Sequence, residues 1–253
     1  MTGRIFIIGL GPGDEALLTP RAAEALGAAS DVFGYLPYVA RVPEREGLRR
    51  HASDNRQEIE RARQALALAA AGRTVAVVSS GDPGVFAMAS AVFEAIEHGE
   101  PAWRELEVEV VPGISAMFAA AARLGAPLGH DFCALSLSDN LKPWDVVLQR
   151  LTASAKAGFV IALYNPISRA RPWQLGAAFD ALREILPPTT PVAFARAVSR
   201  PDERILVTEL KSAEAETADM STLVLIGSVQ TRRLEKPSGE AWLYTPRRLE
   251  ASS

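Results

Sequence analysis

The chain has 253 residues, 48% of them hydrophobic, and a formal net charge of −3. That length accommodates one large domain or two of ordinary size, and the mild negative charge argues against a general nucleic-acid binder. No apolar stretch approaches the ~20 residues of a membrane helix, and the N-terminus lacks a signal-peptide pattern, so we expect a soluble cytoplasmic protein without a membrane or nucleic-acid partner.

Apolar runs typical of β-strands alternate with helical patterns along most of the chain. We predict strands at 4–9, 74–79, 107–111, 132–137, 159–164, 191–196, 204–208 and 221–227. We predict helices at 19–29, 55–71, 86–97, 115–124, 143–156 and 173–186. This alternation predicts an α/β fold of two α/β domains with mixed sheets, mainly parallel at first and antiparallel among the strands from 191 onward.

A glycine- and proline-rich segment at 124–130 lies between a predicted helix and a predicted strand, which is typical of a domain boundary. We therefore predict an N-terminal domain over 1–126 and a C-terminal domain over 131–233. Residues 234–253 contain further proline and glycine and end in two serines. We expect them to form a loosely held tail.

The single cysteine, Cys133, excludes an internal disulfide framework and fits a reducing compartment. It lies in an apolar run, so we expect a buried, inert thiol. The three histidines, His51, His98 and His130, show no metal-ligand spacing, so no metal site is predicted.

The first predicted strand ends in a glycine-rich stretch at 9–14, Gly-Leu-Gly-Pro-Gly-Asp. A dinucleotide-binding fingerprint would need glycine where Asp14 stands. A carboxylate at the start of a helical turn accepts from backbone amides itself and repels phosphate, whereas a ligand with a positive centre, such as a sulfonium, tolerates it. The alternative is a tight turn in which Asp14 is a helix cap.

Three later junctions also follow predicted strands: 80–86 (Ser-Gly-Asp-Pro-Gly-Val-Phe), 111–116 (Val-Pro-Gly-Ile-Ser-Ala) and 163–166 (Leu-Tyr-Asn-Pro). Ser115 is placed to cap the helix that follows it. Asn165 precedes proline, so we expect an extended backbone and a side-chain amide that is free to contact a ligand. Each junction alone is equally well a plain cap or strand end, but together they favour a small-molecule site at the carboxyl ends of strands.

A cationic segment with two leading tyrosines spans 34–56 and is predicted to be a loop. Guanidinium groups pair two-pronged with carboxylates, so this loop suits a flat, anionic ligand. The alternative is an ordinary solvated loop. The predicted substrate-binding arginines, which include a second small cluster, are Arg41, Arg45, Arg49, Arg50, Arg169 and Arg171.

These four motifs and the stretch 221–227 (Ser-Thr-Leu-Val-Leu-Ile-Gly) resemble, in order and at plausible spacing, those of the S-adenosylmethionine-dependent tetrapyrrole methylases. The resemblance spans about residues 3–231. It implies a homodimer of two-domain subunits, with S-adenosyl-L-methionine bound in a cleft between the domains and S-adenosyl-L-homocysteine as product. The residues that match the family's cofactor contacts are Pro12, Gly81, Asp82, Val85, Ser115, Ala116, Asn165, Ala197 and Thr222.

Further segments at 32–38 and 130–144 and the pair Asn165-Pro166 resemble the branch of that family that methylates precorrin-3B at carbon 17 in cobalamin synthesis. For that branch the resemblance implies ring contraction to precorrin-4, with carbon 20 extruded as an acetyl group. A sulfonium methyl and an electron-rich ring carbon need alignment rather than a protein nucleophile. Loss of the proton from the carbon-20 hydroxyl would benefit from a general base, and the candidates are Asp139, Ser138, Asp14 and Asp54.

Two alternatives stay open on the sequence. A related methylase could act on another tetrapyrrole, such as uroporphyrinogen III, another precorrin or a cobalt-containing intermediate, because only the substrate-facing loops would differ. A non-catalytic cofactor-binding module could also use the same scaffold, although all five motifs and the arginine-rich segment are intact.

Overall fold

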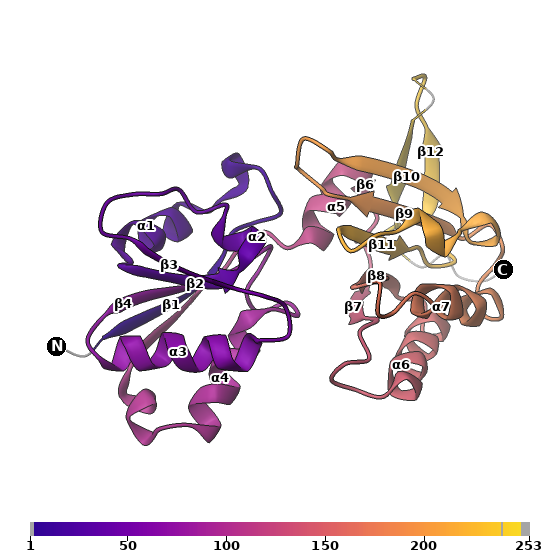
Figure 1. Ribbon diagram of the computed structural model, residues 1–253. Coiled ribbons are helices and arrows are strands. Elements are labelled where there is room, and N and C mark those ends of the chain that lie inside the picture. Colours follow the sequence, from indigo (N-terminus) through magenta and orange to yellow (C-terminus); the bar gives the residue numbers. More distant parts are fainter. Residues whose placement is uncertain (1–2, 239, 249–253) are drawn as a thin grey trace. The chain divides into compact units, whose positions relative to one another are not determined.

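The computed structural model describes residues 3–238 and 240–248, which divide into two compact units, Met1–Ala116 and Met117–Ser253 (Figure 1). The division falls before the predicted boundary because helix α5 (Ala116–Leu124) packs within the second unit. Phe118 meets Phe132 edge to face, with ring centroids 6.2 Å apart. The Tyr164 hydroxyl also accepts a hydrogen bond from the backbone N–H of Met117 at 3.1 Å.

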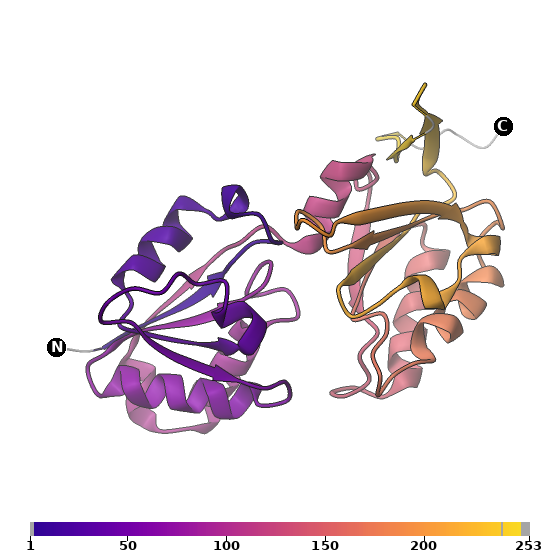
Figure 2. The same ribbon diagram turned by 45° about the horizontal axis from the view of Figure 1, so that its top comes forward.

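The first unit is built on a five-stranded parallel sheet with the strand order β3-β2-β4-β1-β5. Its strands are β1 (Arg4–Gly9), β2 (Asp31–Tyr35), β3 (Arg49–Ser53), β4 (Thr74–Ser79) and β5 (Glu107–Val111). Its helices are α1 (Pro20–Ala28), α2 (Leu36–Val39), α3 (Glu58–Ala70) and α4 (Met88–His98), with 3-10 turns η1 (Glu15–Leu17) and η2 (Pro101–Glu105). Helix α1 lies on one face of the sheet and α3 and α4 on the other (Figures 1 and 2).

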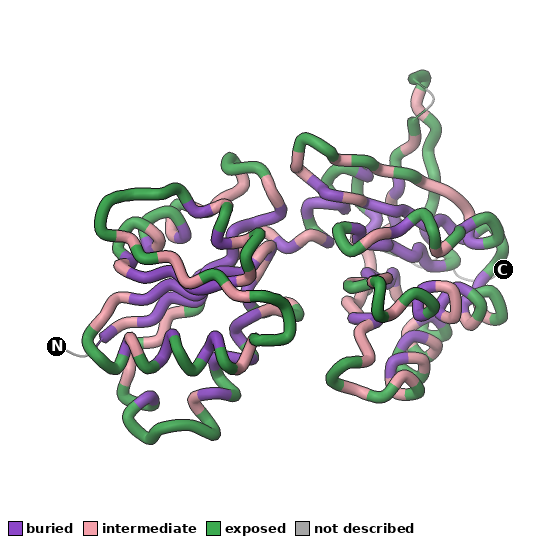
Figure 3. The backbone as a smooth tube through the Cα atoms, in the orientation of Figure 1, coloured by how far each residue is buried: buried purple, intermediate pink, exposed green. Residues whose placement is uncertain are grey.

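Strand β1 fills the core on both faces of this sheet, because successive side chains of a strand point to opposite sides. Phe6 and Ile8 pack in the cluster that includes residues of α1, and Ile5 and Ile7 pack in the cluster of α3 and α4. The central strands are accordingly buried along most of their length (Figure 3). Because all five strands are parallel, their carboxyl ends share one edge, from which the turns after β1, β4 and β5 extend.

Strands β2 and β3 lie where the sequence predicted a loop over 34–56 or no element, and that prediction is wrong for both. Strand β3 reads Arg-Arg-His-Ala-Ser and carries almost no apolar pattern. It pairs at the edge of the sheet through its backbone and through His51, whose ring stacks on Phe33 with centroids 4.2 Å apart and planes 6° from parallel. Pairing of this kind leaves little trace in a hydrophobicity pattern.

Asp31, the first residue of β2, is fully buried and gathers three basic side chains. Its carboxylate lies 2.8 Å from Arg73, 3.0 Å from His51 and 3.3 Å from Arg49, and it accepts from the Ser30 hydroxyl at 2.8 Å. Burial pushes the pKa of Asp31 upward, but the hydrogen bonds from His51, Arg73 and Ser30 outweigh burial and lower the pKa below its ordinary 3.8. The cluster lies at the amino end of β2, away from the glycine turns, so we assign it to stability.

The second unit contains a mixed sheet with the order β10-β9-β11-β8-β7. Its strands are β7 (Phe132–Ser136), β8 (Val160–Tyr164), β9 (Pro191–Arg196), β10 (Arg204–Glu209) and β11 (Thr222–Ile226). The unit also contains the helices α6 (Trp144–Lys156) and α7 (Gln174–Arg183) and the 3-10 turns η3 (Leu210–Ser212) and η4 (Ala215–Thr217). The prediction that the last three are antiparallel neighbours is confirmed, with β9 between β10 and β11. Cys133 is half-buried in edge strand β7, and burial raises the pKa of its thiol.

A three-stranded sheet, β12-β13-β6, uses residues at the ends of the two predicted domains and residues of the predicted tail. It joins β12 (Arg232–Glu235), β13 (Ala241–Tyr244) and β6 (Gly125–Ala126). The tail prediction is therefore wrong for 234–235 and 241–244, since β13 pairs with both neighbours; residues 239 and 249–253 lie outside the described part. Within the described residues, no helix combines the length and apolar character needed to cross a bilayer.

Candidate functional site

The turns after β1 and β4 are joined through their backbones at the carboxyl edge of the first sheet. Gly11 N donates to Gly81 O at 3.1 Å, and Gly81 N donates to Gly11 O at 2.9 Å. Both residues have φ near +66°, a left-handed conformation that glycine adopts without steric cost. The two turns therefore require glycine at both positions.

The turn after β5 closes on the same bridge. A Cβ atom on Gly113 would stand 2.8 Å from the carbonyl carbon of Gly9 and nearer still to Gly81 O. A Cβ atom on Gly9 would stand 2.5 Å from Gly81 O. Glycine thus brings three turns into direct backbone contact, and we call Gly9, Gly81 and Gly113 with their turns the glycine junction.

Carboxylates in two of these turns bind backbone amides. Asp82 Oδ1 accepts from Gly84 N at 2.8 Å and its Oδ2 accepts from Gly113 N at 3.1 Å, so Asp82 links the turns after β4 and β5. Asp14 Oδ1 accepts from Ala16 N at 2.9 Å and caps η1, which confirms the cap that the sequence offered as an alternative. Two carboxylates at these turns suit a ligand with a positive centre better than a phosphate.

The other cofactor residues predicted in the first unit lie in the same turns. Pro12 and Ser115 are buried, Val85 is half-buried, and Ala116 opens α5 as predicted. Phe86, next to Val85, has φ near +51° and a half-exposed side chain. Left-handed backbone in a residue with a bulky side chain is strained, and such strain concentrates at functional positions.

Arg41, which the sequence predicted to bind substrate, links two turns of the glycine junction. Its Nη2 donates to Leu10 O at 2.6 Å, and its Nη1 donates to Gly11 O at 3.2 Å and to Ser80 Oγ at 3.3 Å. The guanidinium therefore ties the turn after β1 to the turn after β4. These donors are directed at groups of the unit's own turns, and the predicted contact of Arg41 with substrate stays a prediction.

The next three arginines of the segment also have partners within the first unit. Arg45 donates to the carbonyls of Leu26 and Ala29 at the end of α1, the first at 3.0 Å. Arg50 contacts Glu44 at 2.9 Å and the carbonyl of Val42, and Arg49 pairs with Asp31. The guanidinium groups of Arg45, Arg49 and Arg50 therefore have carbonyl or carboxylate partners within the unit. That these arginines also bind the carboxylates of a substrate stays a prediction.

In the second unit, the ends of β7 and β8 are linked by a serine and an asparagine. Asn165 Nδ2 donates to Ser136 Oγ at 2.9 Å, and Ser138 N donates to the same oxygen at 3.3 Å. Asn165 has φ near +52°, so the predicted extended backbone is wrong. Asparagine is among the residues that tolerate this left-handed conformation, and here its amide is used to join two strand ends.

Ala197 and Thr222 meet where β9 ends and β11 begins. Ala197 N donates to Ser221 O at 3.0 Å, and Thr222 Oγ1 donates to Asp219 Oδ1 at 2.8 Å. Ala197 and Ser199 have φ near +48° and +63°. Two non-glycine residues with left-handed backbone within three positions indicate a strained turn, at a place that the sequence assigned to the cofactor.

The four candidate bases fall into two groups. Asp14 and Asp54 belong to the first unit, where Asp54 is exposed and accepts from its neighbour Asn55 N at 2.7 Å. Ser138 and Asp139 follow β7 in the second unit, and Asp139 Oδ2 accepts from Gln174 Nε2 at 3.1 Å.

The second predicted basic cluster lies on the turn after β8. Arg171 Nη1 donates to Asn165 O at 3.2 Å, which places the start of this turn against the end of β8. Arg169 is exposed at its tip. Arg169 and Asp139 therefore follow neighbouring strands, β8 and β7, at the same edge of the sheet.

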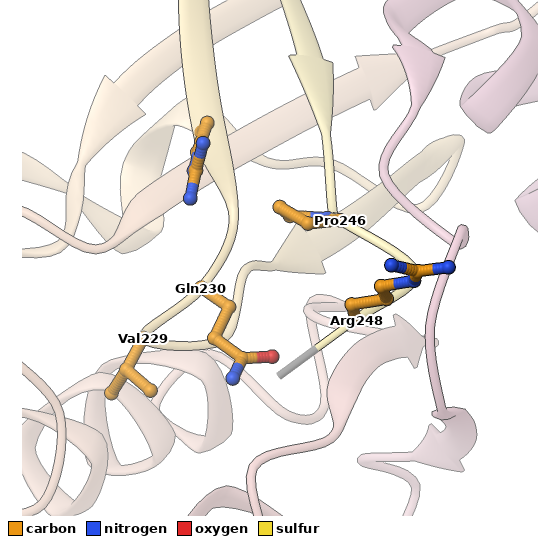
Figure 4. A pocket seen from close by; sticks show the side chains of 5 residues that line it. Val229, Gln230, Pro246 and Arg248 are labelled. Carbon is orange, nitrogen blue, oxygen red and sulfur yellow. The ribbon is translucent and has the colours of Figure 1, made fainter. Parts of the chain in front are cut away.

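A pocket elsewhere in the second unit lies at the base of the β12–β13 ribbon. It is lined by Val229, Gln230, Arg232, Pro246 and Arg248, four of which Figure 4 labels. None of these residues belongs to a strand end of the two large sheets or was predicted as a site residue, so we do not assign it to the ligands considered above.

A model of the family described as tetrapyrrole (corrin/porphyrin) methylases matches residues 4–214, most of the chain. The chain belongs to this family. This tetrapyrrole methylase is 57% identical over 247 residues to a protein of Sinorhizobium sp. named precorrin-3B C(17)-methyltransferase, covering 98% of this chain and 97% of the relative. It is 48% identical over 252 residues to the cobalamin biosynthesis protein CobIJ of Mycobacterium tuberculosis, of which it spans 49%.

Solved structures agree with the fold of this tetrapyrrole methylase. The crystal structure of the methyltransferase CobJ matches with a TM-score of 0.92 and 53% identity, over 96% of this chain and 100% of that one. A uroporphyrin-III C-methyltransferase from Thermus thermophilus, crystallised with S-adenyl homocysteine, matches with a TM-score of 0.66 and 25% identity, over 90% and 98% of the two chains. The α/β architecture with mixed sheets is therefore the fold of the family.

Sequence reasoning about this tetrapyrrole methylase missed two supporting residues. Arg41 was predicted to bind substrate, and nothing in its spacing indicates that it binds Leu10 O. Gln174 was not singled out at all, although a glutamine at a predicted core-facing helix position is a signal that a polar partner lies nearby.

We expect Arg41→Ala to weaken binding of S-adenosylhomocysteine to this tetrapyrrole methylase roughly tenfold, because charge-assisted hydrogen bonds of about 1.5–3 kcal/mol hold two of its turns. Isothermal titration measures the effect. Arg63→Ala on the exposed face of α3 is the control and should leave the affinity unchanged. Equal affinities for the Arg41 variant and the parent would contradict the role.

Proposed function

We propose that the protein is an S-adenosylmethionine-dependent C-methyltransferase that acts on precorrin-3B at carbon 17, with ring contraction to precorrin-4, in aerobic cobalamin biosynthesis. The observation that carries this proposal is the 57% identity, over 98% of this chain, to the precorrin-3B C(17)-methyltransferase of Sinorhizobium sp.. The likeness to CobJ over nearly the whole fold supports it.

The cofactor proposal is supported by the chemistry of the glycine junction. Its turns combine close-packed backbone with the carboxylates of Asp14 and Asp82, and this negative charge suits a cationic ligand and disfavours phosphate. When bound, S-adenosylmethionine supplies an activated sulfonium methyl. The residues proposed to hold it are Pro12, Gly81, Asp82, Val85, Ser115, Ala116, Asn165, Ala197 and Thr222.

The protein's own part in methyl transfer is orientation rather than covalent catalysis. The bridge between Gly11 and Gly81 and the contacts of Arg41 hold the turns in one conformation. A binding site that is already ordered reduces the entropy lost when the two reactants are aligned. No side chain needs to attack the methyl group, because the ring carbon of the tetrapyrrole is the nucleophile.

For the proton that leaves the substrate hydroxyl, we propose Asp139 as general base. Asp14 accepts a hydrogen bond from Ala16 N, and this role as the cap of η1 explains why an aspartate stands at that position. Asp139 follows β7 at a strand end and receives one side-chain donor, Gln174. Arg169 and Arg171, on the turn after β8, are proposed to bind carboxylates of the macrocycle, with Arg169 exposed.

A second candidate substrate is cobalt-factor III. The chain is 42% identical over 226 residues, 89% of its length, to a probable cobalt-factor III C(17)-methyltransferase of Salmonella typhimurium. The two substrates differ in whether cobalt is already in the ring, so the loops that face the ring decide between them.

The test is a methyl-transfer assay with labelled S-adenosylmethionine on a panel of precorrin-3B, cobalt-factor III and uroporphyrinogen III. We expect turnover with precorrin-3B at the highest kcat/KM, and a product heavier by one methyl group in mass spectrometry. Turnover only with cobalt-factor III would move the assignment to the second candidate. Binding of S-adenosylhomocysteine without turnover on any of the three would favour a non-catalytic module.

We also propose a cytoplasmic homodimer, on the resemblance to the family. One chain has a mass of 27.1 kDa, so light scattering at micromolar concentration is expected to give about twice that mass. A mass near 27.1 kDa across the concentration range would contradict the dimer.

A further inference from the structure

Gln174 carries a buried amide at the first residue of α7. The residue is 1% exposed. Its Nε2 donates to Asp139 Oδ2 at 3.1 Å, while its Oε1 is buried and has no hydrogen-bond partner among the described residues. The amide therefore has one bond, to a carboxylate, and one unsatisfied acceptor.

An unsatisfied acceptor at such depth destabilises the fold. Leaving a buried polar atom without a partner costs about 1–3 kcal/mol, and an apolar side chain of similar size would avoid the loss. The next residue, Leu175, is fully buried in the core of the second unit, so α7 begins inside that core. A glutamine that weakens the fold here points to a role outside packing.

The carboxylate that Gln174 contacts lies on a segment without regular structure. Asp139 belongs to the stretch between β7, which ends at Ser136, and α6, which begins at Trp144. Gln174 lies on a helix, beside Trp173, whose ring meets that of Trp144 edge to face with centroids 5.0 Å apart. A hydrogen-bond donor on a packed helix restricts the orientation of a carboxylate on a loop more than the loop backbone alone does.

We propose that Gln174 is a positioning residue that orients the Asp139 carboxylate for removal of the substrate hydroxyl proton. In this step the O–H bond breaks, the proton moves to an Asp139 carboxylate oxygen, and the electron pair stays on the substrate oxygen. The proposal rests on the proposed function, and it adds a residue that acts through Asp139 and lies outside the glycine turns.

The test compares Gln174→Met with Thr190→Val. Thr190 is the matched control. Its Oγ1 is also buried without a partner among the described residues, and it directly precedes β9, outside the site. We expect Thr190→Val to keep or raise the melting temperature. We expect Gln174→Met to change it little, because the lost hydrogen bond to Asp139 offsets the removal of the unsatisfied acceptor. We expect Gln174→Met alone to lower kcat about tenfold to a hundredfold, with KM and the affinity for S-adenosylhomocysteine within about threefold of the parent.

A double-mutant cycle separates positioning from packing. If Gln174 acts through Asp139, Asp139→Asn combined with Gln174→Met is no slower than Asp139→Asn alone. Additive losses, an unchanged kcat in Gln174→Met, or a fall in melting temperature that accounts for the lost activity would overturn the role. The assays use precorrin-3B, the panel member to which the carbon-20 hydroxyl is assigned. A parent without turnover on precorrin-3B rejects the proposed function, whereas an active parent with unaffected variants rejects only this inference.

Discussion

Gly113→Ala is expected to reduce the affinity for S-adenosylhomocysteine by about a hundredfold. The new Cβ atom would stand 2.8 Å from the carbonyl of Gly9 and closer to that of Gly81, and both neighbours are backbone that cannot rotate away. The three turns of the glycine junction must then separate, and a displacement of about 1 Å at such a site costs on the order of 10² in binding or rate. Isothermal titration measures the affinity, and circular dichroism shows whether the fold persists.

Gly27→Ala is the control for the alanine substitution itself. Gly27 lies in α1, and a Cβ atom there would have no neighbour within 4 Å. Alanine is the better helix former, so we expect unchanged affinity and a gain in stability of up to about 1 kcal/mol. An affinity for Gly113→Ala equal to that of the Gly27 variant would show that the junction has no part in binding this ligand.

Asp31→Asn is expected to destabilise the first unit by about 3 kcal/mol. It removes a fully buried negative charge and leaves Arg73 and Arg49 without their carboxylate, and breaking a buried pair from one side costs about 3–5 kcal/mol. We take the lower end because water reaches both arginines. Urea unfolding measures the loss, and Asp180→Asn, which breaks an exposed pair with Arg183, should cost less than about 1 kcal/mol.

The same substitution predicts how stability depends on pH. The pKa of Asp31 is lowered by folding, so its contribution is complete above the ordinary 3.8 and is lost as the pH falls through the lower value of the folded state. The parent and Asp31→Asn should therefore differ fully at pH 7 and converge in acid, below about pH 3.8. A difference in stability that stays constant down to pH 2 would show that the charge of Asp31 is not the cause.

The sequence predicted the elements whose residues repeat a pattern. Strands such as β1 and β4 are continuous apolar runs because they are buried on both faces, and glycine stretches after them marked the turns that the structure brings together. Strands β2 and β3 left no such trace. β2 begins with the charged Asp31, and β3 is stabilised by contacts with a partner that no local window contains.

The side-chain roles were harder to predict because they depend on distant partners. The sequence pattern of an arginine-rich segment does not distinguish side chains that face solvent, substrate or main-chain carbonyls. Only the fold shows that Arg41 and Arg45 donate to carbonyls of the unit itself. For Asn165 the rule that residues before proline are extended was overridden, because the side chain reaches Ser136 from a left-handed backbone.

The pairing of β13 with β6 has a consequence for the order of folding during synthesis. Thr245 donates to the carbonyl of Pro127, 118 positions earlier in the chain, at 2.6 Å. The first sheet uses only residues up to Val111, so it can assemble while the ribosome is still making the second unit. Residues 125–126, by contrast, can pair only after strand β13 has been synthesised, more than 100 residues later in the chain. A nascent chain that stalls before Ala241 would leave the edge of β6 unpaired and accessible to chaperones or to other chains.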